Sequence, residues 1–86
     1  MPKVTHYVAP VYPDEAKEDH LEGEVFVKIL VNIDGLPLQE IVIKSSNEIF
    51  NQPAIDASKA FMFTPLIKNG TKEICWVVIP FKFALR

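Results

Sequence analysis

The stretch that decides the fold is residues 72–86, which read KEICWVVIPFKFALR. Its apolar side chains fall on successive positions, so it predicts one long β-strand with two apolar faces. Pro80 lies in the middle of this strand and has no N–H to give to a sheet ladder, which places the strand at a sheet edge. A long apolar edge strand is a template for another strand unless it is protected. The first functional question is therefore what pairs with it.

The centre of the chain predicts a β-hairpin. Residues 24–33 carry an aliphatic side chain at every odd position, so the odd face is expected to be the core face. Asp34-Gly35 is a tight-turn signal, because glycine accepts the positive φ that a hairpin turn needs. Residues 36–46 form the return strand, where apolar side chains compete for both faces. A β-bulge would reconcile them.

Two helices are predicted, one before and one after the hairpin. The first begins near Pro13, which suits a first helical position, and ends before Gly23. The second has Asn51 as its N-cap. Its apolar stripe recurs at helical spacing through Phe50, Ala54, Ala57 and Phe61. Asn69-Gly70 then predicts a turn into the closing strand.

The predicted order is helix, strand, strand, helix, strand. The economical two-layer solution is an α+β fold, with two helices packed on one face of a three-stranded antiparallel sheet. The closing strand is expected to pair with residues 24–33, which then form the central strand. Residues 36–46 and the closing strand are the two edge strands. The chain has 86 residues and is expected to form a single domain, residues 1–86, with residues 1–9 as an extended arm.

The composition is that of a folded globular domain, with 49% hydrophobic and 23% charged residues. The formal net charge of −2 gives no sign of nucleic-acid binding. No stretch approaches the roughly 20 apolar residues of a membrane span, and the N-terminus has no signal-peptide core. The chain is therefore expected to be either cytosolic or a piece of a longer anchored protein.

No cluster of side chains predicts catalysis, a metal site or a cofactor. His6 and His20 are not spaced as metal ligands, and Cys75 is predicted to point into the core as an inert thiol. Ser45-Ser46 has no base beside it in the sequence, and a glycine-rich phosphate loop is absent. We therefore expect a protein that is not an enzyme and needs neither a metal nor a cofactor.

A series of short motifs runs in a fixed order along the chain. They are Pro10-Val11-Tyr12-Pro13, Leu21-Glu22-Gly23-Glu24-Val25, Val31-Asn32-Ile33-Asp34-Gly35, Lys44-Ser45-Ser46, Ala60-Phe61-Met62-Phe63-Thr64-Pro65, Lys68-Asn69-Gly70 and Val78-Ile79-Pro80-Phe81-Lys82-Phe83. In this order and spacing they resemble the C-terminal domain of the TonB family, from about Pro10 to Leu85. In well-known members a Gln precedes the Pro-x-Tyr-Pro segment and contacts the partner. Ala9 holds that place here, so that side-chain contact is not carried over.

The resemblance implies an energy-transducing role in the periplasm. Such domains are tethered by a proline-rich linker to an inner-membrane helix that works with a proton-driven motor complex. They bind the N-terminal TonB box of outer-membrane transporters as an added strand and pull on it. For this chain, the resemblance implies that the motor complex is reached only through an upstream anchor.

The predicted partner-binding residues fall into two groups. Residues with the parity of Pro80 should offer free backbone groups, which makes Ile74, Trp76 and Val78 the docking row. The resemblance adds the segment Ala9, Pro10, Val11 and Tyr12. Tyr12 is either a packing anchor for the first helix or a ligand contact. Trp76, on the face opposite the helices, belongs either to cross-strand packing or to a contact surface.

Two functions remain open at this point. The first is a module that captures an extended transporter segment and transmits force. The second is a structural or adaptor domain that forms a homodimer through its edge strand, or binds an envelope protein other than a transporter.

Overall fold

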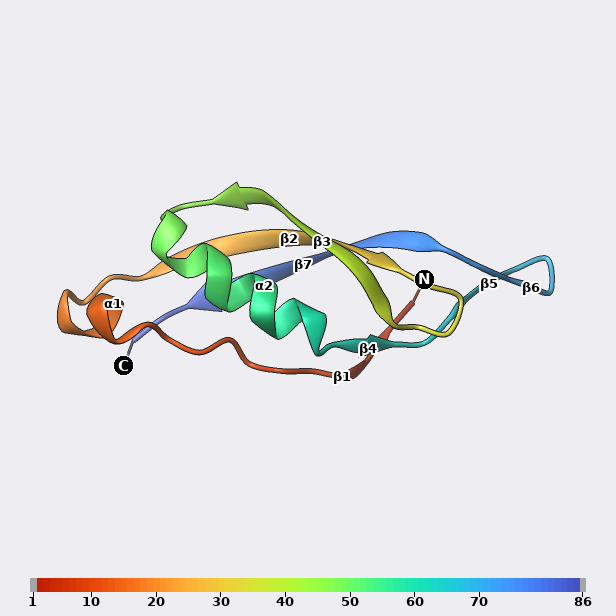
Figure 1. Ribbon diagram of the computed structural model, residues 1–86, viewed down its shortest axis with the longest axis horizontal. Coiled ribbons are helices and arrows are strands. Elements are labelled where there is room, and N and C mark those ends of the chain that lie inside the picture. Colours follow the sequence, from red (N-terminus) through yellow and green to blue (C-terminus); the bar gives the residue numbers. More distant parts are fainter. Residues whose placement is uncertain (1, 86) are drawn as a thin grey trace.

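The computed structural model describes residues 2–85 and shows an elongated molecule of 50 × 20 × 17 Å (Figure 1). Its elements in chain order are β1 (Val4–His6), α1 (Asp14–Glu18), β2 (Gly23–Val31), β3 (Pro37–Ser45), the 3-10 turn η1 (Glu48–Phe50), α2 (Asn51–Lys59), β4 (Met62–Phe63), β5 (Leu66–Lys68), β6 (Thr71–Glu73) and β7 (Cys75–Phe83). The α+β class and the three-stranded antiparallel sheet are those predicted from the sequence.

The three-stranded sheet has the order β3-β2-β7, so the closing strand lies at an edge as Pro80 predicts. The aliphatic odd residues of β2 are fully buried, which confirms the predicted alternation for Val25, Val27, Ile29 and Val31. Ile33, the last residue of the predicted core face, lies beyond the end of β2 and is exposed, so the prediction is wrong at that position. Two register shifts interrupt the pairing of β2 with β3, where Ile43 and Leu38 are left without a partner. The predicted bulge in the return strand is thus confirmed, and it occurs twice.

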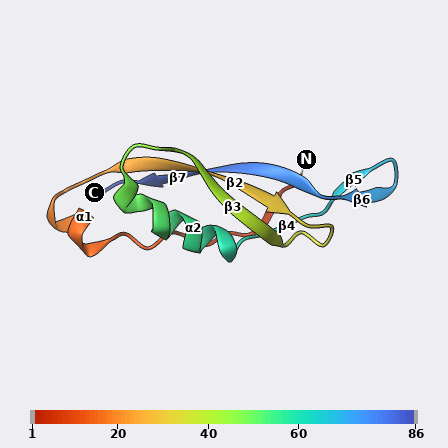
Figure 2. The ribbon, with the colours of Figure 1, turned by 45° about the horizontal axis from the view of Figure 1, so that its top comes forward.

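One face of the sheet is covered mainly by α2, which packs across β3 and β2 (Figures 1 and 2). The stripe predicted for this helix is its buried face. The proline segment, defined here as residues 7–13, runs beside α2. It packs against β7 through Tyr12, whose ring lies 5.7 Å from that of Phe83. Helix α1 lies at one end of the molecule and buries Ala16 (Figure 1). The expectation that both helices cover one face of the sheet is therefore confirmed for α2. It is wrong for α1, which lies at one end of the molecule.

The prediction that residues 72–86 form one strand is wrong. Ile74 separates β6 from β7, and β6 pairs with β5 rather than with β2. Asn69 and Gly70 both have positive φ, 54° and 79°, which is the geometry of a tight two-residue hairpin. The β5–β6 hairpin extends beyond the sheet at the end opposite α1 (Figure 1).

One further local prediction needs correction. Asn47 rather than Asn51 caps the second helical segment, because its Oδ1 accepts from the Ile49 N–H at 3.1 Å and η1 leads into α2. The predicted N-terminal arm contains β1, which pairs with β4 in a second small sheet.

The turn of the β2–β3 hairpin is joined to β4. Gly35 has a φ of +86°, and its carbonyl accepts from the Phe63 N–H at 2.9 Å. Asn32 Oδ1 accepts from the N–H groups of Asp34 and Leu36, both at 2.9 Å, which fixes the turn from its other side. The hairpin tip therefore packs against the chain that follows α2.

Candidate functional site

The free backbone groups of β7 can be assigned from the bonds of β2. The Ser46 N–H donates to the Glu24 carbonyl at 3.0 Å, and the Asn32 N–H donates to the Leu36 carbonyl at 2.8 Å. Even residues of β2 therefore bond toward β3, and odd residues bond toward β7, because the direction alternates along a strand. Each odd residue of β2 is paired with an odd residue of β7. The even residues of β7, Pro80 among them, consequently point their N–H and C=O groups to the open edge.

The two edges of the sheet differ in regularity. From Gly23↔Phe83 to Val31↔Cys75, β2 pairs with β7 without a register shift. On the other side, β3 carries two bulges, and bulges twist an edge away from further pairing. The edge of β7 is therefore the better template for an added strand.

The side chains of β7 alternate as predicted. Its odd residues face the core side, where Phe81 and Phe83 are buried and Cys75 is a half-buried free thiol. On the other side Trp76 and Val78 are 42% and 48% exposed. Ile74, the first residue of the predicted docking row, lies outside β7 between two strands. The row of free groups therefore begins at Trp76.

Aromatic rings and lysines share the sheet face opposite α2. Lys28 Nζ lies 4.6 Å from the centroid of the Trp76 ring, and Lys44 Nζ lies 5.8 Å from that of Phe26. Leu30 is the register partner of Trp76. Both alternatives for Trp76 thus have structural support, because it packs across strands and keeps an exposed surface beside the open edge.

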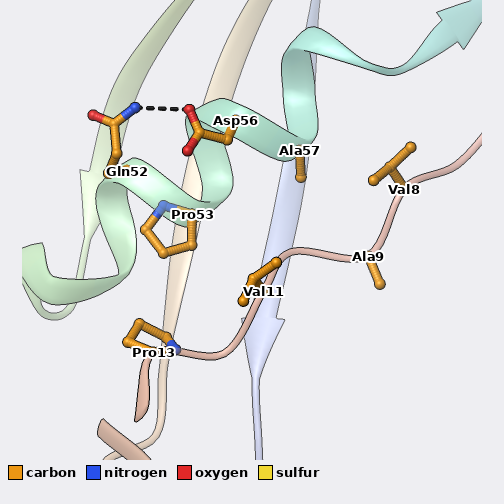
Figure 3. Close-up of a pocket in the computed structure, with 8 residues that line it drawn as sticks. All are labelled: Val8, Ala9, Val11, Pro13, Gln52, Pro53, Asp56 and Ala57. Atoms are coloured by element: carbon orange, nitrogen blue, oxygen red, sulfur yellow. Dashed lines mark hydrogen bonds between the residues drawn. The ribbon is translucent and has the colours of Figure 1, made fainter. Parts of the chain in front are cut away.

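A groove of about 400 Å³ lies between the proline segment and α2 (Figure 3). We call it the α2 groove. Its lining consists of Val8, Ala9, Val11, Pro13, Gln52, Pro53, Asp56 and Ala57. On the α2 side, Gln52 Nε2 donates to Asp56 Oδ1 at 2.8 Å. The predicted residues Ala9 and Val11 thus line this groove, whereas Trp76 and Val78 lie on the other face of the sheet.

The structure therefore divides the predicted partner-binding residues between two surfaces. Gln52, Pro53 and Asp56 were not predicted as site residues. The signal that could have identified Gln52 and Asp56 is their place among the exposed polar residues of α2, beside Ala57 of the buried stripe. Their closeness to the proline segment depends on how that segment crosses the sheet, which local sequence patterns do not contain.

Tyr12 is placed as a packing anchor. Its ring meets Phe50 and Phe83 edge-on, and its hydroxyl donates to the Leu21 carbonyl. Burial, with a smaller contribution from the Glu22 carboxylate, raises the pKa of Tyr12 above its ordinary value of 10.0. Of the predicted residues in the proline segment, Tyr12 therefore serves the fold.

The raised pKa of Tyr12 predicts a loss of stability in alkaline solution. Because the folded state favours the neutral phenol, its contribution is complete below about pH 10 and is lost as the pH rises through the raised pKa. We expect the wild type to lose more free energy of unfolding between about pH 9 and pH 11 than Tyr12→Phe does. Urea titrations at both pH values measure this, with Tyr7→Phe, at an exposed ring, as the control. Equal losses in wild type and Tyr12→Phe would contradict the prediction.

Within residues 2–85, no three His, Cys, Asp or Glu side chains lie close enough together to hold a metal ion. None of the helices formed by these residues has the length and apolar character needed to span a bilayer.

Comparison with known proteins identifies relatives over nearly the whole chain. Residues 8–85 match the family described as Gram-negative bacterial TonB protein C-terminal. The chain is 31% identical over 83 residues to Protein TonB of Vibrio cholerae serotype O1, a match that covers 95% of this chain and 34% of that protein. It also resembles the solution NMR structure of the Pseudomonas aeruginosa TonB CTD, with a TM-score of 0.78 and 26% identity. That match covers 98% of this chain and 86% of the other.

Proposed function

The chain belongs to the Gram-negative bacterial TonB C-terminal family, and we propose that it captures an extended segment of an outer-membrane transporter as a strand added to β7. Membership of this family of energy transducers implies a role in energy transduction for outer-membrane transporters, without an enzymatic reaction. The finer proposal is that the captured segment is the transporter's N-terminal TonB box, and that the domain transmits force through it.

The observation that carries this proposal is the regular open edge of β7. Trp76, Val78 and Lys82 direct their backbone groups outward, and Pro80 interrupts the row without breaking the pairing with β2. Strand addition uses such a row of main-chain donors and acceptors for affinity and uses side chains beside it for specificity. The exposed Trp76 and Val78 supply such side chains here.

The expected affinity is modest. About four to six added hydrogen bonds, at about 1 kcal/mol each, must offset an association cost of about 4–15 kcal/mol. Side-chain contacts make up the difference, so binding is expected in the range of about 1 μM. Weak binding suits repeated engagement and release. If the guest strand were pulled parallel to β7, the hydrogen bonds between the two strands would share the force at the same time.

We further propose a periplasmic location with an inner-membrane anchor. The chain spans about a third of the length of the Vibrio cholerae protein that it matches. By analogy with the family, an upstream span and linker would connect this domain to the motor complex.

An NMR titration of the backbone amides with a TonB-box peptide tests the proposal. We expect the amides of Trp76, Val78 and Lys82 to shift, while Ile43, in a bulge of the opposite edge, does not. A peptide that binds without moving the β7 amides, or that does not bind at all, would refute strand addition at this edge.

A homodimer is the second candidate, because the same free groups of β7 would be satisfied by β7 of another copy. Light scattering after size exclusion, with and without the TonB-box peptide, separates the two functions. A dimer that the peptide does not displace favours self-association. A partner other than a transporter is the remaining alternative, because Ala9 replaces the Gln that contacts the partner in well-known family members. Titration with peptides of other envelope proteins tests this alternative.

A further inference from the structure

The outer face of the sheet, opposite α2, carries more positive charge than the chain as a whole. Its side chains are Glu24, Phe26, Lys28 and Leu30 of β2, Gln39, Ile41 and Lys44 of β3, and Trp76, Val78, Pro80 and Lys82 of β7. They include three lysines and one glutamate, although the chain has a formal net charge of −2. This face is therefore complementary to an anionic partner.

The three lysines of the outer face differ in their neighbours and in their distance from the open edge. Lys44 lies over the ring of its register partner Phe26, but it is on β3, the strand farthest from that edge. Lys82 is the register partner of Glu24, so an opposite charge stands across from it. Lys28 has Val78 on one side and Ile41 on the other, so both of its register partners are apolar. Its ammonium instead lies over the Trp76 ring. Lys28 is thus a cation whose cross-strand partners offer it no carboxylate.

A guest strand would bring new side chains within reach of this cation. Side chains of paired strands point to the same face, so guest residues opposite Trp76 and Val78 would project onto the outer face. Strands lie about 4.7–4.9 Å apart, which places the guest next to β7 and two strands from β2. The Lys28 ammonium already reaches across to the ring of Trp76. It therefore lies between β2 and the position of the guest.

The ammonium can serve the ring and a carboxylate at the same time. An ammonium has three N–H donors, and its attraction to the aromatic face does not require all of them. A carboxylate arriving from the guest strand would approach on the side away from β2. Trp76 would then form an apolar floor beneath the ion pair.

We propose that the segment captured by β7 carries an Asp or Glu on the outer face, opposite Trp76 or Val78, and that Lys28 recognises it. This inference rests on the proposed strand addition. It assigns Lys28 a role in partner specificity, with Trp76 holding its ammonium in place. The partner is thus an extended segment in which an acidic residue accompanies apolar ones.

A carboxylate scan tests the proposal. The probe is the TonB-box peptide of the NMR titration, remade as pairs that carry Asp or Asn at each position in turn. Against the wild type, Asp at one outward position should bind up to about fivefold more tightly than Asn, which is the range of an exposed ion pair. The preference should vanish in Lys28→Met and persist in Lys17→Met, a matched change at an exposed lysine on α1.

The outcomes separate this inference from the proposed function. If the peptides move the β7 amides but no position prefers Asp, strand addition stands and the role of Lys28 is refuted. The same conclusion follows if the preference survives in Lys28→Met, or disappears only in Lys82→Met. If no peptide of the series moves the β7 amides, the proposed function fails and this inference fails with it.

Discussion

Val78→Pro is expected to weaken binding of the TonB-box peptide at least tenfold while the domain stays folded. Val78 is an even residue of β7, so its N–H points to the open edge and does not serve the pairing with β2. Proline removes this donor and places its ring where the guest backbone would lie. One lost hydrogen bond costs about 1 kcal/mol, and the steric conflict adds to it, so a loss of about 1.4 kcal/mol or more follows. Peptide titration followed by NMR measures the effect.

Two variants at neighbouring positions serve as controls for Val78→Pro. Val78→Ala keeps the N–H and should retain most of the backbone contribution to binding. Val77→Pro removes an N–H that points to β2 and leaves a β2 carbonyl without its donor, so it should destabilise the domain by about 1–3 kcal/mol. If Val78→Pro bound the peptide as tightly as Val78→Ala does, the peptide would not bind along the outward backbone groups of β7 at Val78, and the proposed docking row would be wrong. If Val77→Pro lowered the free energy of unfolding less than Val78→Pro does, the odd residues of β7, and not the even ones, would point their N–H groups to the open edge.

Gly35→Ala is expected to destabilise the domain by about 3 kcal/mol or more. A Cβ at this position would lie 1.9 Å from the carbonyl oxygen of Phe63, which is backbone and cannot rotate away. The φ of +86° adds a cost of about 1–2 kcal/mol for a residue with a side chain, and the overlap adds about 1–3 kcal/mol. The hydrogen bond from Phe63 to Gly35 would also be strained. Urea denaturation measures the change in the free energy of unfolding.

Gly70→Ala is the matched control for Gly35→Ala. Gly70 has a similar φ of +79°, but a Cβ there would meet no heavy atom within 4 Å. Its cost is therefore limited to the backbone conformation, about 1–2 kcal/mol. The difference between the two variants isolates the close approach of the hairpin tip to β4. Equal costs would show that this approach contributes nothing.

The parts of the fold that the sequence could predict are those encoded by local periodicity. The buried odd positions of β2 and the stripe of α2 follow from spacings of two and of three to four residues. Pro80 could place β7 at an edge because a missing N–H has the same meaning in any sheet. The break between β6 and β7 at Ile74 could not be predicted from such local patterns. An unbroken apolar run does not show where one pairing partner ends and another begins.

The remaining errors have similar physical causes. Asn47 and Asn51 are both good N-cap residues, and only the 3-10 turn between them decides which one caps. The pairing of β5 with β6 depends on strands of three residues, which are too short to show alternation. At the site, the free edge and the proline segment could be named from the sequence. Their separation onto different faces depends on tertiary packing.

The two bulges of β3 limit how many strands this domain can accept. A sheet with two regular edges can be extended from both sides, and copies of it can then join without end. Here only the β7 edge is regular, since the β3 edge is interrupted at Ile43 and Leu38. Under the proposed function, each domain would therefore take one added strand directly onto its own sheet, at β7. A second copy and a transporter segment would compete for the free edge of β7. Dimerisation would therefore reversibly inhibit binding of the transporter segment.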